Sequence, residues 1–283
     1  MSSVTARIEE IQKDPILKQP RGGYIQTSWF NKKTLNVPSP LCSDLYQKEN
    51  ISPSLVGSVV DYMTRFMLDK NQNHMERVFN AFKISIIGFQ RLALLTKATK
   101  SQIENTMLPI ITKIKGVDDL SIFNACRLAS YDVWVRNPSW AIMNFNPDAD
   151  IIPDIVPDIN TVKNIQKMVQ RSICFMQQYG PILKDGFTFE DNGYTKTVNS
   201  GDGDFLTYDT LWDFKTIKGN LTAKHSLQLM MYWIMGQHSG QDIYKNISKI
   251  GIFNPRLNIV YTLDVAVVPD DTINFIEKKI ICY

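Results

Sequence analysis

The chain has 283 residues, of which 44% are apolar and 11% aromatic, a composition typical of a globular protein with a substantial core rather than of a disordered chain. Its net charge of +3 excludes a polycation that binds nucleic acid by charge alone, although a local groove could still be basic. The polar N-terminus and the lack of any apolar window of roughly 18 residues favour a cytoplasmic protein without a membrane span.

The first half of the chain has the apolar spacing of helices. Ser52 is a good helix cap and Pro53 suits a first helical turn, so a helix is expected to begin there. The predicted helices cover residues 52–70, 74–97, 100–116 and 118–136, and a fifth covers 161–180. A stretch rich in Pro and Asp at 146–160 separates the fifth helix from the others.

After residue 180 the apolar period changes from 3.6 to 2, which indicates strands. Strands are predicted at 185–190, 203–209, 210–217, 247–255 and 258–268, and helices at 222–238 and 269–280. Asp209 and Thr210 are the expected tight turn between the second and third strands. This order predicts an α/β fold, a mixed sheet flanked by helices with a helical N-terminal half, divided into residues 1–50, 51–158 and 159–283.

Four aspartates lie in the short stretch GDGDFLTYDTLWDFK, residues 201–215. Strand alternation places Asp204 on one face of its strand, and a hairpin brings it beside Asp213 and Lys215. Two carboxylates about 4 Å apart repel each other by roughly 4 kcal/mol at an effective dielectric near 20. A divalent cation such as Mg²⁺ would offset that repulsion and leave room for a phosphate.

The residues GDGDFL, then WDFK, then QLMMY on the following helix resemble the PD-(D/E)xK nuclease superfamily, most closely its RecB-type branch. Asp204 matches the first acid of that pattern, Asp213 and Lys215 match its D-x-K, and Gln228 and Tyr232 match its Q-x3-Y helix. The likeness covers roughly residues 160–264, in an order that agrees with the superfamily core of helix, three-stranded meander, helix and strand. It implies a restriction-endonuclease-like core and a hydrolase that cleaves phosphodiester bonds.

The resemblance also implies a cofactor and further site residues. Asp204, Asp213 and the main-chain carbonyl of Phe214 would hold Mg²⁺ or Mn²⁺, while Lys215 orients the attacking water. Asp202 has the same strand parity as Asp204 and is an alternative ligand. Lys224, one helical turn before Gln228, and Arg256, between two strands, are candidates for contact with the nucleic acid, with DNA expected ahead of RNA.

An acid from an earlier helix often completes the metal shell in this superfamily. Asp61 and Asp132 are the candidates, but each has an arginine four residues later, Arg65 and Arg136, so ordinary helix salt bridges are the alternative. The helix at 52–70 is similar to the opening helix of RecB-type domains, in which case residues 70–158 form a helical insertion.

Other chemistry is disfavoured by spacing. The four cysteines are far apart and no GxxxxGK is present, so neither a zinc or iron–sulfur site nor a nucleotide-powered motor is expected. His225, near the predicted site, is expected to have a supporting or surface role. Two alternatives to an active nuclease remain: a binding module with the same fold and a nucleic-acid or protein partner, in a defence, counter-defence or repair complex or as a homo-oligomer, and an acidic surface without a ligand.

Overall fold

The computed structural model describes residues 2–146, 151 and 155–283. Its contacts divide the chain into two units: a sheet unit of residues 1–36 and 175–283, and a helical unit of residues 37–174. The expected α/β fold, with a mixed sheet flanked by helices, is confirmed. The unit boundaries differ from those drawn from the sequence, because the first 36 residues are part of the sheet unit rather than a separate segment.

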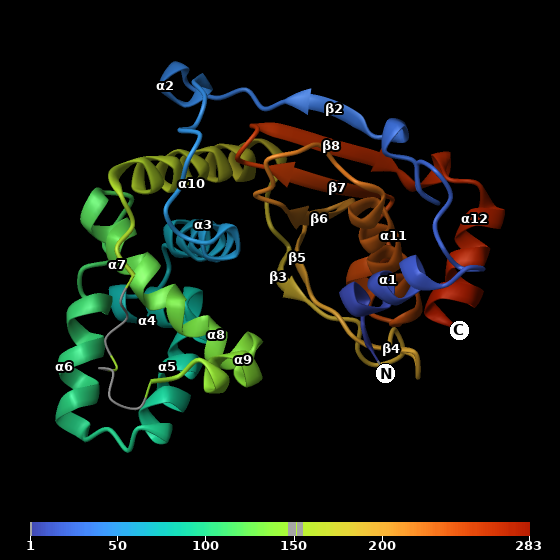
Figure 1. Ribbon diagram of the computed structural model, residues 1–283. Helices are drawn as coiled ribbons and strands as arrows, with labels where there is room; N and C mark the ends of the chain where they lie inside the picture. Colours follow the sequence, from blue (N-terminus) through green and yellow to red (C-terminus); the bar gives the residue numbers. More distant parts are fainter. Residues whose placement is uncertain (1, 147–150, 152–154) are drawn as a thin grey trace. The chain divides into compact units, whose positions relative to one another are not determined.

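Six strands form the main sheet, in the order β2-β8-β7-β6-β5-β3 (Figure 1). Only the β6–β7 pair is parallel in this sheet. In chain order the strands are β2 (Asn31–Thr34), β3 (Lys184–Phe187), β5 (Gly203–Leu206), β6 (Thr210–Phe214), β7 (Lys249–Asn254) and β8 (Ile259–Asp264). A separate parallel pair joins β1 (Ser2–Ser3) to β4 (Val198–Ser200).

The five strands predicted after residue 180 are present as β3, β5, β6, β7 and β8, with one shifted turn, and β1, β2 and β4 are additional to them. Of these additional strands, β2 is the exposed segment NKKT, which lacks apolar alternation and forms an edge strand by pairing with β8. The turn between β5 and β6 is Tyr208–Asp209, because Thr207 N donates to Thr210 O at 3.0 Å. The predicted turn at Asp209–Thr210 is therefore one residue too late.

The two faces of the sheet carry different cores. On one face, Leu206, Leu211 and Ile250 pack in the cluster that also contains the buried residues of α11 (Ala223–His238). On the other face, Phe175 of α10 (Ile159–Tyr179) stacks on Phe253, with a ring-centroid distance of 4.4 Å. Trp212, Phe205 and Phe214 surround the Phe175 ring. Because side chains alternate between the two faces along β5 and β6, they pack into two separate layers, one on each face of the sheet.

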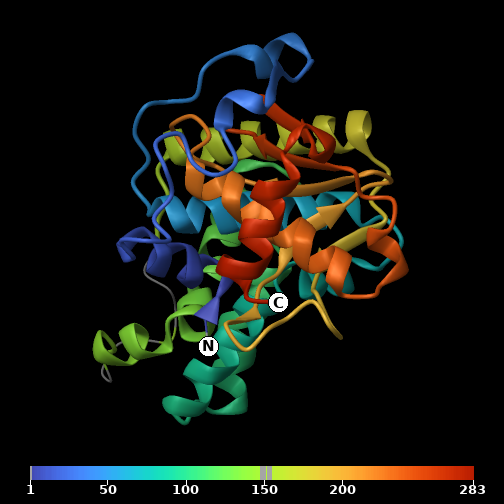
Figure 2. The same cartoon turned by 90° about the vertical axis from the view of Figure 1, so that its right-hand side faces the viewer.

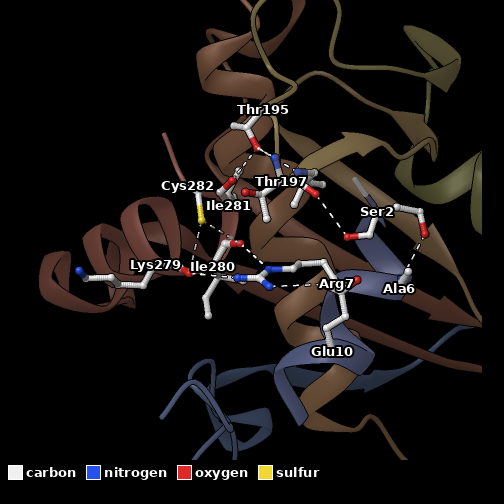
Figure 3. Close-up of polar contacts among 12 residues, drawn as sticks. Ser2, Ala6, Arg7, Glu10, Thr195, Thr197, Lys279, Ile280, Ile281 and Cys282 are labelled. Carbon is white, nitrogen blue, oxygen red and sulfur yellow. Dashed lines mark hydrogen bonds and ion pairs between the residues drawn. The ribbon is translucent and has the colours of Figure 1, made fainter. Parts of the chain in front are cut away.

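The N-terminal helix and the C-terminus are tied together in the sheet unit. The helix α1 (Val4–Lys13) packs against α11, and the chain ends with α12 (Asp270–Phe275) and a π-helical turn at Ile276–Ile281. Arg7 Nε donates to the carbonyl of Ile280 at 2.9 Å, and Thr195 Oγ1 donates to that of Ile281 at 2.6 Å (Figure 3). Figure 2 shows the resulting proximity of the two chain ends.

The helical unit contains the predicted helices with some breaks. Ser52 caps α3 as expected, since its Oγ accepts a hydrogen bond from Leu55 N at 3.2 Å. The single helix predicted at 74–97 is two helices bent by 81°. The helices are α2 (Ser39–Cys42), α3 (Pro53–Leu68), α4 (His74–Ala81), α5 (Lys83–Leu95), α6 (Lys100–Ile111), α7 (Asp119–Ala129), α8 (Val133–Arg136), α9 (Pro138–Met143) and α10 up to residue 174.

Two further predictions from the sequence concern an interruption of the helices at 146–160 and the lack of a membrane span. Within the Pro- and Asp-rich interruption predicted at 146–160, residues 147–150 and 152–154 lie outside the described residues, and the helix α10 begins at Ile159. Among the described residues no single helix is long and apolar enough to cross a membrane; only α4 and α5 taken together reach that length and composition.

Candidate functional site

The register of the β5–β6 hairpin brings the two predicted acids together. Phe205 pairs with Trp212 and Leu206 with Leu211, so the next position of the same register sets Asp204 opposite Asp213. Directly opposite residues share a face of the sheet. Asp204, Asp213 and Lys215 therefore lie on the face covered by α11, and we call these three residues the acid–lysine site.

Asp213 is buried and in contact with Lys215. The side chains of Asp213 and Lys215 are 6% and 24% exposed. Lys215 Nζ donates to Oδ1 at 2.9 Å and lies 2.8 Å from Oδ2. Oδ2 is an ion-pair neighbour only, because it is fully buried and receives no hydrogen bond of acceptable angle within the described chain. Asp213 thus keeps one oxygen without a directed donor.

The side chain of Asp204 accepts a hydrogen bond from β6 at the point where the backbone pairing of β5 and β6 ends. Their pairing ends at Phe205 and Trp212, and the amide of Phe214 donates to Asp204 Oδ2 at 2.5 Å. The N–H and C=O of one strand residue point to the same side of the strand. The carbonyl of Phe214 is therefore directed to the Asp204 side, as the predicted metal-ligand set requires.

Glycine precedes Asp204 for a steric reason. A Cβ atom at Gly203 would lie 1.8 Å from the ring of Phe187, which pairs with Gly203 across β3 and β5. The ring occupies the space that any side chain would need, so the small residue lets β3 and β5 approach next to the site. Packing against Phe187 therefore requires glycine at position 203 in this chain.

Charge at the site holds Lys215 in its protonated form. Burial alone lowers the pKa of the Lys215 ammonium, but the negative charges of Asp213 and Asp204, the hydrogen bond to Asp213 and the charge of Asp202 together raise the pKa above its ordinary value. The charge of Asp202 is thus felt at Lys215, although Asp202 lies before the first residue of β5.

Gln228 and Tyr232 cover the acid–lysine site from α11. Gln228 Nε2 donates to the hydroxyl oxygen of Tyr232 at 2.9 Å, and Tyr232 is 4% exposed. Burial raises the pKa of Tyr232, and the charges of Asp213, Asp202 and Asp204 raise it further. Tyr232 is therefore a neutral hydroxyl close enough to the acid–lysine site to be affected by its charges.

His225 is closer to the acid–lysine site than the sequence indicated, since the charges of Lys215 and Asp213 affect its pKa. Its Nδ1 accepts a hydrogen bond from the amide of Thr222 at 3.3 Å and lies 3.1 Å from the Thr222 hydroxyl oxygen. Burial lowers the pKa of His225, and the positive charge of Lys215 lowers it further, against the charge of Asp213. The signal in the sequence was the capping-box spacing Thr222–His225 at the start of α11.

The two candidate acids from earlier helices have partners of their own in the helical unit. Asp61 Oδ1 lies 2.9 Å from Arg65 Nε, and Asp132 Oδ2 lies 3.3 Å from Arg136 Nε. Both ion pairs that the sequence suggested are therefore present. Asp132 also accepts hydrogen bonds from Tyr62 and Ser85, at 2.6 Å each.

The two candidate nucleic-acid contacts differ in exposure. Lys224 is exposed in the first turn of α11 and remains available. Arg256 is only 8% exposed, and its Nε donates to the carbonyl of Thr216 at 2.8 Å. This side chain links the segment that follows β6 to the β7–β8 connection, and little of it is exposed for contact with a nucleic acid.

A hard divalent cation fits the chemistry of the acid–lysine site. The buried Asp213 Oδ2 without a directed hydrogen bond, the facing Asp204 and the Phe214 carbonyl offer the oxygen ligands that Mg²⁺ and Mn²⁺ take. Among the residues that the structure describes, no three His, Cys, Asp or Glu side chains form a metal-binding group. The ligand set would thus be two carboxylates, a carbonyl and water, which is common for Mg²⁺.

Comparisons of the chain with protein-family models, with curated proteins and with solved structures give no match. The geometry of the acid–lysine site and the order of the elements around it are therefore the features that bear on function.

Proposed function

We propose that the chain is a metal-dependent nuclease of the PD-(D/E)xK type, RecB-like, which hydrolyses phosphodiester bonds of nucleic acid, with DNA as the expected substrate, in the cytoplasm. The single observation that carries this proposal is the juxtaposition of Asp204, Asp213 and Lys215 on one sheet face, with a buried Asp213 oxygen that lacks a directed hydrogen bond.

The order of elements around the site supports the proposal. A long helix, α10, precedes the antiparallel meander β3-β5-β6, and α11 then leads to β7, which pairs parallel with β6 (Figure 1). This is the sequence of helix, three-stranded meander, helix and strand that a restriction-endonuclease-like core requires. The remaining elements, such as β2 and β8, extend that sheet at one edge.

Each site residue has a role in the proposed reaction that its geometry supports. Asp204, Asp213 and the Phe214 carbonyl would hold Mg²⁺ or Mn²⁺, which supplies a Lewis acid that neutralises phosphate charge and acidifies water. Lys215, kept protonated by its two acidic neighbours, would orient the attacking water and stabilise charge that grows on the phosphate. Gln228 and the neutral Tyr232 would hold the backbone of the strand for in-line attack.

The first test is cleavage of linear, circular and single-stranded DNA and of RNA, with Mg²⁺ or Mn²⁺ and with a chelator. Lys215→Ala is expected to lower the cleavage rate about 10²- to 10⁴-fold without unfolding the chain, as for the loss of an activating group. Lys249→Ala is the matched control. Lys249 also forms a lysine–aspartate ion pair in the same sheet, 2.7 Å from Asp209, but with 43% of its side chain exposed.

The control separates catalysis from sheet stability. If both variants keep parental activity, or if both lose it equally, the role assigned to Lys215 is wrong. Circular dichroism and thermal unfolding verify that each variant is folded.

A binding module with the same fold is the second candidate, and one observation favours it. The acid–lysine site is partly satisfied from within, because Asp204 accepts the Phe214 amide and Lys215 pairs with Asp213. A protein of this kind would retain DNA on a gel without metal-dependent cleavage, and would act with a nucleic-acid or protein partner. Calorimetry that detects no Mn²⁺ binding would favour this candidate over the nuclease.

A further inference from the structure

A cavity of about 300 Å³ lies in the sheet unit beside the start of α11. Its apolar and aromatic lining residues are Phe30, Leu221 and Tyr261, and its polar lining residues include Ser28, Lys32 and Asn220. Pockets for small ligands hold about 300–1,000 Å³. The cavity is at the small end of that range and suits a single planar ring system rather than a whole nucleotide.

The cavity is aligned with the acid–lysine site along one row of the sheet. Asp213 pairs with Ile252, Ile252 with Tyr261, and Tyr261 with Lys32. Directly paired residues share a face, so Tyr261 and Lys32 lie on the same face as Asp204 and Asp213. Strands are about 4.8 Å apart, which puts Tyr261 about 10 Å from Asp213 along the row.

The polar groups of the cavity are arranged around Asn220. Lys32 Nζ donates to Asn220 Oδ1 at 3.2 Å, and the hydroxyl of Tyr261 donates to the same oxygen at 3.5 Å. Because both bonds engage the carbonyl side of the amide, Nδ2 is left as a donor. Among the described residues it has no hydrogen-bond partner. Amide donors of this kind bond the acceptor atoms on base edges.

The ammonium group of Lys32 adds positive charge at the rim. Lys32 is exposed on the edge strand β2, and its Nζ lies 5.9 Å from the centre of the Tyr261 ring. An aromatic wall, an amide donor and a lysine are the groups that hold successive bases and phosphates of single-stranded nucleic acid.

We infer that this cavity is a subsite for one nucleobase of a single-stranded segment, next to the nucleotide whose phosphate is cleaved at the acid–lysine site. The inference depends on the proposed nuclease function. The base enters between Phe30 and Tyr261, Asn220 Nδ2 donates to its edge, and Lys32 contacts the adjoining phosphate.

The test uses variants of the two exposed residues and a matched control. Lys32→Ala and Asn220→Ala are compared with Lys33→Ala, because Lys33 is the next exposed residue of β2, pairs with Val260 and points to the opposite sheet face. On a single-stranded substrate we expect KM to rise about tenfold for the first two variants, with kcat unchanged, as for the loss of one base contact. Lys33→Ala should leave both constants near the parental values.

Substrates with one abasic residue locate the subsite along the strand. An abasic residue at one position next to the cleaved bond should raise KM about tenfold for the parent. The rise should be much smaller for Asn220→Ala, because this variant has already lost the contact with the base. A 2-aminopurine at that position should change its fluorescence on binding to the parent but not to Asn220→Ala.

The two ways to fail are distinguishable. If the parent cleaves nucleic acid but Lys32→Ala and Lys33→Ala behave alike, or if no abasic position matters, the base subsite is wrong and the nuclease function stands. If the parent cleaves no nucleic acid under any metal condition, the proposed function fails and the subsite falls with it.

Discussion

Each unit of the molecule has a buried aspartate, and their surroundings differ. Asp132 of the helical unit accepts hydrogen bonds from Tyr62, Ser85 and Arg136. Asp213 of the sheet unit has Lys215 as its cation, and one of its oxygens receives no directed hydrogen bond. Burial of a carboxylate costs several kcal/mol unless charge and hydrogen bonds offset it. Asp132 has that compensation within its unit, whereas Asp213 has only part of it.

This difference separates a structural carboxylate from one that could serve a ligand. The hydroxyls of Tyr62 and Ser85 each contact a different oxygen of Asp132, which leaves the group little to offer a ligand. The partial compensation at Asp213 is tolerable where a cation completes it, and strain of this type concentrates at functional sites. If the two aspartates divide in this way, variants of Asp213 should affect activity and variants of Asp132 should affect stability.

The largest effect is expected for Asp213→Asn. Removal of the carboxylate charge takes away a proposed metal ligand, so cleavage should fall about 10³-fold or more, in the range seen for loss of preorganised electrostatic stabilisation. The variant should be less stable, because Lys215 loses its ion-pair partner, but it should still fold, since asparagine has the shape of aspartate and Asp204 remains as a negative charge near Lys215. Cleavage kinetics and urea unfolding measure both quantities. A variant that cleaves normally would remove Asp213 from the site.

Asp132→Ala should have the opposite profile. The change leaves the Tyr62 and Ser85 hydroxyls without their acceptor in a buried place and should lower the free energy of unfolding by about 3 kcal/mol. Tyr62→Phe removes only one of these bonds and should cost about 1 kcal/mol. Urea unfolding measures both, and activity per folded molecule should stay at the parental level. A loss below 1 kcal/mol for Asp132→Ala would contradict the structural role.

The sequence was sufficient for the acid–lysine site because its information is local. Strand alternation sets Asp204, Asp213 and Lys215 on one face, and the error in the turn did no harm. With a turn one residue later, Asp204 would lie opposite Lys215 instead of Asp213. That is a shift of two positions on β6, and side chains alternate with a period of two, so the face is the same.

The surroundings of Asp132 could not be predicted, because they depend on contacts between distant residues. Arg136 is four residues away and visible in the sequence, but Tyr62 and Ser85 lie 70 and 47 residues before Asp132. The same limit applies to Arg256, whose partner Thr216 is 40 residues away. The edge strand β2 was missed because it is exposed throughout, so its segment has no apolar period.

Metal binding offers a smaller but direct comparison. At a Mn²⁺ concentration about 100 times Kd, binding to the folded state alone should stabilise it by about 2.7 kcal/mol, or a melting temperature higher by about 5 °C or more. Asp213→Asn should lose this rise, while Tyr62→Phe should keep it, since the Asp132 network has no part in the proposed site. Thermal unfolding with and without Mn²⁺ measures the shift. An equal rise in both variants would place the ion elsewhere.

The smallest effect is expected for Asp61, because its ion pair with Arg65 is partly exposed and contributes little to the free energy of unfolding. The side chains of Asp61 and Arg65 are 29% and 24% exposed, and the pair spans one turn of α3. Salt bridges of this spacing contribute about 0.3–0.5 kcal/mol to stability. Asp61→Ala should therefore lower the free energy of unfolding, measured with urea, by about 0.5 kcal/mol. Mn²⁺-dependent cleavage should stay at the parental rate. Loss of cleavage in a folded Asp61→Ala protein would instead make Asp61 the additional metal ligand, and the structural carboxylates would then be represented by Asp132 alone.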